Sequence, residues 1–275
     1  MANVLDPSNE ELRSLLYRNF RAFFTKAEAK RRWSLESDIP WADVNRNMSP
    51  AVAAVVESFC AVELFLPDYV AKSLPMLRQN RGWSWFQFNW AYEESKHSMA
   101  LGDWLLRSGL RTEEQMFDLQ QEVYAHEWQL PMDSPSGMVI YGMTQELATW
   151  VNYKRLRQRA DEVGDPALSR VLQLIAIDER AHHTYYAQMV KAFLELDRPS
   201  TLEQMRRVLH NFAMPAVYLM ADSKQREADI RALDVFTEDV YFDEVYFPIL
   251  RTLGVTRAEM KGRALKKSSP ATNIT

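Results

Sequence analysis

The sequence contains a single cysteine, Cys60, so no disulfide can form within the chain and no cysteine-rich metal site can be built. Glycine is scarce, at 8 of 275 residues, and no segment alternates apolar and polar residues between turn signals as a strand does. The formal net charge of −4 provides no basic field for nucleic acid. Leucine, alanine, glutamate and arginine are abundant instead, which favours an all-α chain.

No apolar run reaches the roughly 18 residues that a membrane span needs. The first residues, MANVLDPSNEEL, have neither the basic nor the apolar segment of a secretory signal. We therefore expect no membrane span, no nucleic-acid partner and a cytoplasmic location. The length suits one large domain, so we expect residues 1–275 to form a single domain with a polar, mobile tail at 261–275.

Capping residues and helix breakers predict where the helices begin and end. Predicted helix starts are Ser8-x-x-Glu11, Ser49 before Pro50, Thr112-x-x-Gln115, Asp165 before Pro166 and Thr201-x-x-Gln204. The main predicted helices span residues 49–79, 84–108, 138–163 and 165–196, with shorter ones at 215–254. The residues from 49 to 197 are the predicted bundle.

Two Glu-x-x-His pairs stand out, Glu94–His97 and Glu179–His182. Each pair is preceded by a lone glutamate in an apolar helix, Glu63 before the first and Glu146 before the second. Residues three apart share a helix face, so each pair can point at one metal ion. Four carboxylates and two imidazoles are the ligand set with which a helical bundle holds two iron or manganese ions.

The spacing of these residues predicts that they meet. Glu63 and Glu94 are equidistant from the polar break Arg78–Gly82, and Glu146 and Glu179 are equidistant from the break at 164–166. In an antiparallel helix hairpin, residues equidistant from the turn lie at equal depth. A glutamate buried in an apolar helix costs several kcal/mol unless it is paired or bound to metal. We therefore predict a two-metal centre, and the absence of thiolate favours iron or manganese over zinc.

Pro67 predicts a local distortion beside this centre. Proline has no N–H to bond the carbonyl of Glu63 four residues earlier, so the helix should kink or loosen near that ligand.

Five segments together resemble the soluble acyl carrier protein (ACP) desaturases, a ferritin-like di-iron family. The segments are VELFLPDY around Glu63, WAYEESKH at 90–97, QELATW at 145–150, DERAH at 178–182 and NFAMP at 211–215. The resemblance covers about residues 50–220, and the mycobacterial members are the most similar in motif and length. It implies a ferritin-like four-helix bundle with flanking helices.

The resemblance also implies roles for particular residues. The implied iron ligands are Glu63, Glu94, His97, Glu146, Glu179 and His182. Thr149 matches the threonine that the family places beside the dioxygen position, although its hydroxyl can also bond its own helix backbone. Trp90 and Asp178 match residues behind the ligands, and Asp178 would orient the His97 ring.

The implied reaction removes two hydrogens from a saturated chain on ACP, with dioxygen and two electrons from a ferredoxin. The implied assembly is a homodimer. Because ACP is acidic, its docking face should be basic. The candidate clusters are Lys26–Lys30–Arg31–Arg32, Lys154–Arg155–Arg157–Arg159 and Lys266–Lys267.

The chain departs from the family pattern at Ser95, Lys96 and Ala181, where members carry other residues, including arginine. These changes spare the ligands and affect their surroundings. Several other residues are expected to be structural. These are Cys60, Glu57, His126 and His210, together with His183, which could compete with His182 as a ligand. Glu93 is expected to be a polar partner.

Two other functions fit the same ligand set. One is a different di-iron or di-manganese oxidase that hydroxylates or N-oxygenates its substrate. The other is a ferritin-like metal-binding protein without enzymatic activity. Product analysis separates the first from a desaturase, and cage assembly would indicate the second.

Overall fold

The structure, a computed structural model, describes residues 5–261. Within this range every regular element is helical and no strand occurs, so the all-α prediction is confirmed. The tail that was predicted to be mobile lies outside the described residues, apart from Lys261.

The helices are α1 Glu10–Lys30, α2 Pro50–Leu64, α3 Leu66–Leu77, α4 Arg81–Arg107, α5 Glu113–Tyr124, α6 Pro135–Glu162, α7 Pro166–Leu196, α8 Arg198–Leu209, α9 Ser223–Ala232, α10 Glu238–Val240, α11 Phe247–Leu253 and α12 Arg257–Met260. Short 3₁₀ turns lie at Trp41–Asp43 (η1) and Val217–Leu219 (η2), and a π-helical turn, η3, spans Tyr241–Tyr246 between α10 and α11.

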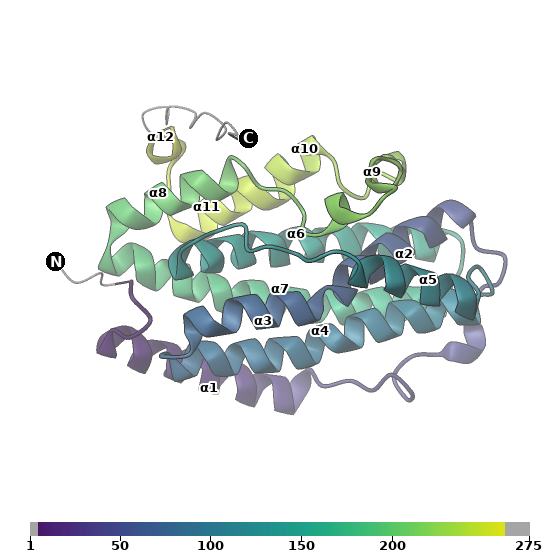
Figure 1. Ribbon diagram of the computed structural model, residues 1–275, viewed down its shortest axis with the longest axis horizontal. Helices are drawn as coiled ribbons and strands as arrows, with labels where there is room; N and C mark the ends of the chain where they lie inside the picture. Colours follow the sequence, from purple (N-terminus) through teal and green to yellow (C-terminus); the bar gives the residue numbers. More distant parts are fainter. Residues whose placement is uncertain (1–4, 262–275) are drawn as a thin grey trace, which may run out of the picture.

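Four long rods form the bundle (Figure 1). Helices α2 and α3 follow one another along α4, and α6 packs against α7 over its whole length. Helix α4 also contacts α7, and α2 and α3 contact α6, which closes the bundle around one apolar core. Helix α1 lies against α4 and α7, while α8 and η3 cover α6 on the other side. Two hairpins therefore face each other, as the spacing of the glutamates predicted.

The helix starts test the capping predictions. The capping box of Thr112 and Gln115 is present, and Ser49 and Asp165 cap α2 and α7 as predicted. The box at Ser8 is wrong, because the Ser8 hydroxyl donates to Asp6 at 2.6 Å and Asn9 caps α1 instead. The start at Thr201 is also wrong.

Helix α8 begins earlier than predicted, at Arg198, because Asp197 accepts a hydrogen bond from the Ser200 N–H at 3.1 Å. The Thr201 hydroxyl donates to the Asp197 carbonyl at 2.7 Å, one turn back, and so acts inside the helix.

The predicted helix at 49–79 is divided in two. Helix α2 ends at Leu64 and α3 begins at Leu66, three residues after the ligand candidate Glu63. Pro67 occupies the first turn of α3, where the lack of an N–H is tolerated, so the break is the predicted effect of this proline.

The same stretch contradicts the prediction that no apolar run is long enough to span a membrane, although it does not contradict the expectation of no membrane span. Pro50–Leu77 has the length and apolar composition of a membrane-crossing helix, with a mean hydropathy of 1.6 in its best window. The prediction of no such run counted uninterrupted apolar residues, whereas here isolated acids interrupt a strongly apolar segment. In the structure 56% of that window is buried inside the bundle, as expected for a core helix that meets the same criteria.

Candidate metal centre

Six buried side chains from four helices converge in the middle of the bundle. Helix α2 contributes Glu63, α4 contributes Glu94 and His97, α6 contributes Glu146, and α7 contributes Glu179 and His182. They form two groups, and within each group the donor atoms lie within 4.8 Å of one another. The first group is Glu63, Glu94, His97 and Glu179, and the second is Glu94, Glu146, Glu179 and His182.

Glu94 and Glu179 belong to both groups, which gives each a bridging position. Each comes from the Glu-x-x-His motif of its helix, and the lone glutamates Glu63 and Glu146 occupy opposite ends of the cluster. The two groups correspond to the two copies of the sequence pattern, because each group contains one of the lone glutamates. A pair of cations shared between two bridging carboxylates fits this geometry.

Both imidazoles direct Nδ1 into the cluster. His97 Nδ1 lies 3.3 Å from Glu94 Oε2 and 3.4 Å from Glu179 Oε1. His182 Nδ1 lies 3.0 Å from Glu94 Oε1 and 3.1 Å from Glu146 Oε2. Nitrogen and oxygen donors thus face one small volume from all sides.

Three of these atoms are buried without a hydrogen bond: Glu94 Oε1, His97 Nδ1 and Glu179 Oε1. A buried polar atom that lacks a partner costs about 1–3 kcal/mol. Divalent cations between the two groups would satisfy all three atoms, so the residues present fit a two-metal site. Carboxylate and imidazole donors without thiolate favour iron or manganese.

The shifted pKa values show that the charged forms of the buried glutamates are unfavourable when no cation balances them. Burial, and then the charge of Glu94, raises the pKa of Glu63 well above its ordinary value, and burial with Glu179 does the same for Glu146. Burial alone would lower the pKa of both histidines, but the carboxylates around them raise it well above the ordinary value. Protons on these glutamates and histidines therefore balance the negative charge that bound cations would otherwise balance.

Behind the candidate ligands, each histidine is held by an acid of the opposite motif. His97 Nε2 lies 3.4 Å from Asp178 Oδ2, and His182 Nε2 lies 2.7 Å from Glu93 Oε2. Each acid directly precedes the glutamate of its own motif. The Asp178 contact is the one that the sequence predicted. Glu93 was expected to be only a polar partner. Both motif glutamates are directly preceded by an acid in the sequence, and this shared feature could have identified Glu93 as the residue that holds His182.

Arginine side chains hold these two acids in place. Arg31 Nη1 donates to Asp178 Oδ1 at 2.5 Å and its Nη2 lies 2.9 Å from Glu93 Oε1, while Arg32 also pairs with Glu93. Trp33 Nε1 donates to Asp178 Oδ2 at 2.7 Å. The prediction that Arg31 belongs to a basic docking face is therefore wrong, because its guanidinium group turns inward to neutralise buried carboxylates. Arg32 is divided between the exposed Glu28 and the buried Glu93, while Lys26 and Lys30 of the same cluster are exposed.

The second basic cluster is also partly neutralised. Lys154 and Arg155 both pair with Glu244, and Arg155 pairs with Asp234 as well. The third cluster, Lys266–Lys267, lies outside the described residues.

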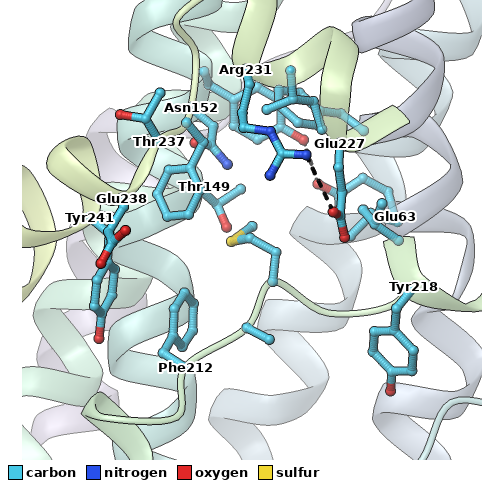
Figure 2. Close-up of a pocket in the computed structure, with 18 residues that line it drawn as sticks. Glu63, Thr149, Asn152, Phe212, Tyr218, Glu227, Arg231, Thr237, Glu238 and Tyr241 are labelled. Carbon is cyan, nitrogen blue, oxygen red and sulfur yellow. Dashed lines mark hydrogen bonds and ion pairs between the residues drawn. The ribbon is translucent and has the colours of Figure 1, made fainter. Parts of the chain in front are cut away.

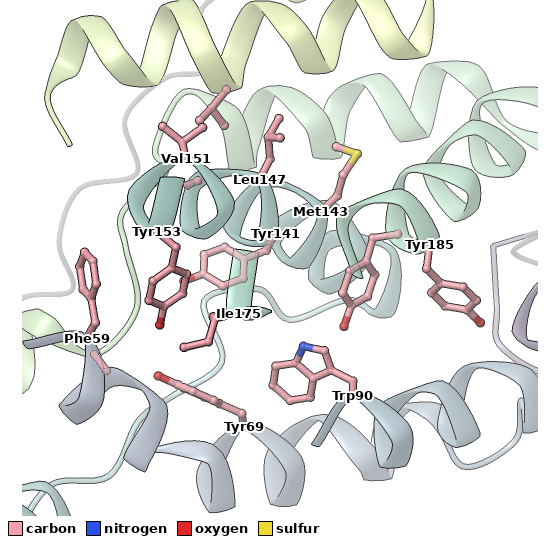
Figure 3. Packing of buried hydrophobic residues seen from close by; sticks show 14 of the residues in the cluster. Phe59, Tyr69, Trp90, Tyr141, Met143, Leu147, Val151, Tyr153, Ile175 and Tyr185 are labelled. Atoms are coloured by element: carbon pink, nitrogen blue, oxygen red, sulfur yellow. The ribbon is translucent and has the colours of Figure 1, made fainter. Parts of the chain in front are cut away.

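Two aromatic side chains bond the lone glutamates. Trp90 Nε1 donates to Glu146 Oε1 at 3.0 Å, and the Tyr153 hydroxyl donates to Glu63 Oε1 at 2.5 Å. The sequence placed Trp90 behind the ligands but missed Tyr153, which lies seven residues after Glu146 and so shares its face of α6. Figure 3 shows Trp90 and Tyr69 facing Tyr141 and Tyr153 across the core.

The remaining candidates lie outside the cluster. The His183 ring bonds the Met143 carbonyl at 2.8 Å, and burial lowers its pKa to about 4. The His210 ring lies 3.3 Å from the Tyr246 hydroxyl, and His126 is exposed. Glu57 pairs with Arg111 and Arg226, as a structural acid would.

The departures from the family pattern have visible consequences. Lys96 Nζ lies 3.9 Å from the centre of the Trp33 ring, so this lysine packs on the tryptophan that holds Asp178. The Ser95 hydroxyl donates to the Tyr92 carbonyl at 2.7 Å and faces away from the cluster. The structure gives no particular role to Ala181.

An apolar cavity of about 410 Å³ reaches the cluster from one side (Figure 2). Glu63 and Thr149 lie on its inner wall, and Arg231, Glu227 and Glu238 on its outer part. Its volume falls within the roughly 300–1,000 Å³ of small-molecule sites. The Thr149 hydroxyl donates to the Gln145 carbonyl at 2.8 Å, the local backbone bond that the sequence left open, while the side chain still borders the cavity.

A second, much smaller recess of about 50 Å³ lies on the far side of the cluster, beside Glu146 and Trp90. Tyr69, Trp128 and Tyr141 are among the buried side chains that line it. Of these two cavities, the one on the Thr149 side is by far the larger.

Known proteins resemble this chain over most of its length. Residues 47–264 match the sequence model of a family described as fatty acid desaturase. DesA1 of Mycobacterium tuberculosis, named as an acyl-ACP desaturase, is 23% identical over 206 residues, 66% of this chain and 60% of its own length. The seed-specific, chloroplastic stearoyl-ACP 9-desaturase of Brassica napus is 29% identical over 172 residues, 58% of this chain and 42% of the relative. The matches thus span less than two thirds of these relatives.

The X-ray structure of DesA2 from Mycobacterium tuberculosis H37Rv, titled as an acyl-ACP desaturase, superposes with a TM-score of 0.68. The likeness covers 92% of this chain and 98% of that one, at 16% sequence identity. At such low identity the match concerns the fold alone, and it confirms the predicted ferritin-like helical architecture.

Proposed function

Because the chain belongs to the fatty acid desaturase family, we propose that it uses a di-iron centre to desaturate a fatty acyl chain carried on ACP. The observation that carries the proposal is the contact between the donor cluster and the apolar cavity. Glu63 belongs to both, and Thr149 lies on the same wall. A saturated chain in this cavity would pass directly beside the cluster.

The proposed ligands are Glu63 and His97 for one ion, Glu146 and His182 for the other, with Glu94 and Glu179 shared. Two iron ions bound there would supply the redox chemistry with dioxygen that breaks unactivated C–H bonds. In balance, the saturated chain, one O₂, two electrons and two protons give the unsaturated chain and two waters. A ferredoxin-type protein is the proposed electron donor.

The chain's own residues would orient the substrate and control protons. Phe59, Phe212 and Tyr241 line the cavity and would hold the acyl chain extended while excluding water. The Thr149 hydroxyl, between cavity and cluster, can exchange its backbone hydrogen bond for one to a reacting group and pass a proton. Asp178 and Glu93 keep both imidazoles oriented with Nδ1 toward the ligands.

The decisive experiment supplies iron-loaded protein with saturated acyl-ACP thioesters of several chain lengths, a reduced ferredoxin system and dioxygen. We expect an unsaturated acyl product by mass spectrometry. Glu146→Gln should abolish it, while Glu162→Gln, an exposed change on the same helix α6, should not. A hydroxylated product would instead indicate another oxidase, and absence of any product with all chain lengths would contradict the proposal.

Carrier docking can be tested separately from chemistry. If the acidic ACP is attracted by exposed basic residues such as Lys26 and Lys30 on α1, its affinity should fall steeply as salt rises from low to physiological levels. Fluorescence anisotropy of labelled ACP measures this. Affinity that is independent of salt would count against electrostatic docking and leave the reaction itself untouched.

The identity of the metal and the oligomeric state can each be measured separately. Metal analysis and the optical spectrum of purified protein distinguish iron from manganese. Size-exclusion chromatography distinguishes the proposed homodimer from a cage, which would indicate metal storage. We place the protein in the cytoplasm, as its sequence led us to expect.

A further inference from the structure

Asn152 is a buried polar side chain on the wall of the apolar cavity beside the donor cluster. It is 2% exposed, and its Oδ1 atom has no hydrogen bond. It follows Thr149 by one turn of α6 and lines the same cavity. Figure 2 draws Asn152 on the cavity wall near Thr149, and no dashed line reaches its amide. This amide is therefore part of the surface that a ligand in the cavity would meet.

The polar groups around Asn152 do not satisfy it. Four other side chains that line the cavity carry hydroxyl groups that are already hydrogen-bonded within the protein. They belong to Thr149, Tyr153, Thr237 and Tyr241. None of these bonds involves Asn152, so its partner has to come from outside the described chain.

The helix and the cavity wall would both be better served by an apolar residue at this position. Asparagine is a poorer helix former than leucine, and a buried polar atom without a partner destabilises the folded state. In the donor cluster, unpaired buried atoms mark a place for cations. By the same argument, the unpaired atom of Asn152 marks a place for a hydrogen-bonding group of the ligand.

We infer that the acyl chain accepted by this cavity carries a hydroxyl group that hydrogen-bonds Asn152. A hydroxyl both donates and accepts, so it pairs with either the oxygen or the NH₂ of an amide. The Asn152 amide can present either one, because rotation about its last side-chain bond is only weakly restricted. The inference rests on the proposed function, since it names the class of acyl chain that the same cavity takes.

The depth of Asn152 assigns this contact to the chain and not to the linker that joins the chain to ACP. The charged side chains on the outer part of the cavity, Arg231 among them, are exposed. Asn152 is buried instead, one helical turn from Thr149 and close to Glu63 of the donor cluster. The part of the substrate beside Asn152 is therefore near the carbons that react.

The spacing on α6 also predicts where the hydroxyl lies along the chain. Thr149 and Asn152 are three residues apart, which corresponds to about 4.5 Å along the helix axis. An extended chain covers that length in roughly three to four covalent bonds. We therefore expect the hydroxyl a few carbons away from the double bond that forms beside Thr149.

Binding without turnover tests the contact. Iron-loaded, full-length protein without an electron donor is titrated with labelled ACP, and fluorescence anisotropy gives the affinity. The ACP carries either a plain hexadecanoyl chain or the same chain with one hydroxyl, which is moved carbon by carbon. At its best position the hydroxyl should strengthen binding roughly 10- to 100-fold over the plain chain. Equal affinity for every chain would overturn the inference, and this comparison needs no variant.

Asn152→Leu tests the residue itself. Leucine replaces the amide by an apolar group of similar size, so the variant should fold, as circular dichroism and the melting temperature verify. It should bind the hydroxylated chain roughly 10- to 100-fold more weakly than the native protein does, and the plain chain more tightly. The matched control is Gln158→Leu, at an exposed position of the same helix, which should keep the native preference.

Two results with Asn152→Leu would contradict the contact. One is a folded variant that still prefers the hydroxylated chain. The other is an equal loss of affinity for both chains, because this would place Asn152 against the linker to ACP.

Turnover separates this inference from the proposed function. With a reduced ferredoxin system and dioxygen, moving the hydroxyl by one carbon should move the double bond by one carbon in the native protein. If plain and hydroxylated chains are desaturated equally well at the same carbons, the proposed function stands and this inference fails. If no chain is desaturated while the hydroxyl still strengthens binding, the contact with Asn152 stands and the proposed reaction fails.

Discussion

The two histidines of the centre are each oriented by an acid from the other motif. Asp178 on α7 faces His97 on α4, and Glu93 on α4 faces His182 on α7. This crossing ties the two Glu-x-x-His helices together behind the ligands. Arg31 contacts both acids and so couples the two halves from the outside. A change at one acid should therefore be felt by the imidazole across the bundle.

Asp178→Asn tests this coupling. The amide keeps the shape of the side chain but can present its NH₂ to the His97 ring, and it loses the charge that stabilises Arg31. We expect metal affinity to fall roughly 10- to 100-fold, as is typical when an acid behind a histidine ligand is lost. A competitive metal titration measures it, with Asp161→Asn, exposed on α6, as the control. Equal affinity in both variants would show that Asp178 does not orient the ligand.

Cys60 provides a prediction about pH. Burial, and then the charges of Glu63 and Glu57, raise the pKa of its thiol to about 12, whereas an unfolded cysteine titrates near about 8.5. At pH 8 the folded protein should therefore not react with a thiol reagent until denaturant is added. Between the two pKa values only the unfolded chain ionises, so this thiol lowers stability as the pH rises through that window. Rapid labelling at pH 8 without denaturant would contradict the assignment.

At the scale of elements, the sequence predicted positions along the chain better than directions of side chains. The duplicate spacing placed the ligands on facing hairpins because helix periodicity and turn position are local properties. Pro67 located the break between α2 and α3 for the same reason. Arg31 was misassigned to the surface because its direction depends on how α1 packs against α4 and α7. Tyr153 was missed because an apolar helix offers many tyrosine positions and only packing selects one.

The crossing of α1 over α4 depends on Gly82. A Cβ at this position would lie 2.3 Å from the Tyr17 nitrogen and 2.5 Å from the Leu16 carbonyl oxygen, both backbone atoms that cannot rotate away. Gly82→Ala should therefore separate the helices and destabilise the protein by at least ~2 kcal/mol, although alanine is the better helix former. Thermal unfolding measures the loss. A melting temperature equal to or above that of the native chain would show that the close approach is not required.

At the scale of the whole molecule, the buried donor cluster should influence stability as well as the proposed chemistry. The bundle buries four carboxylates and two imidazoles in the core that should hold it together. Without cations this requires protons on groups such as Glu63 and Glu146, whose pKa values burial raises. The fold should thus be less stable empty than loaded, because only the folded bundle brings the six donors together.

Metal binding should therefore raise the melting temperature. Binding to the folded state alone stabilises by about 2.7 kcal/mol when free metal is ~100 times its dissociation constant. For a chain of this size that corresponds to a rise of roughly 5 °C. Scanning calorimetry with Fe²⁺ under nitrogen, or with Mn²⁺, measures it. Glu146→Gln removes one negative ligand at nearly constant shape and should lose most of the rise, whereas the exposed Glu162→Gln should keep it. An unchanged melting temperature in the native chain, or an equal rise in Glu146→Gln, would mean that the cluster is not the metal site.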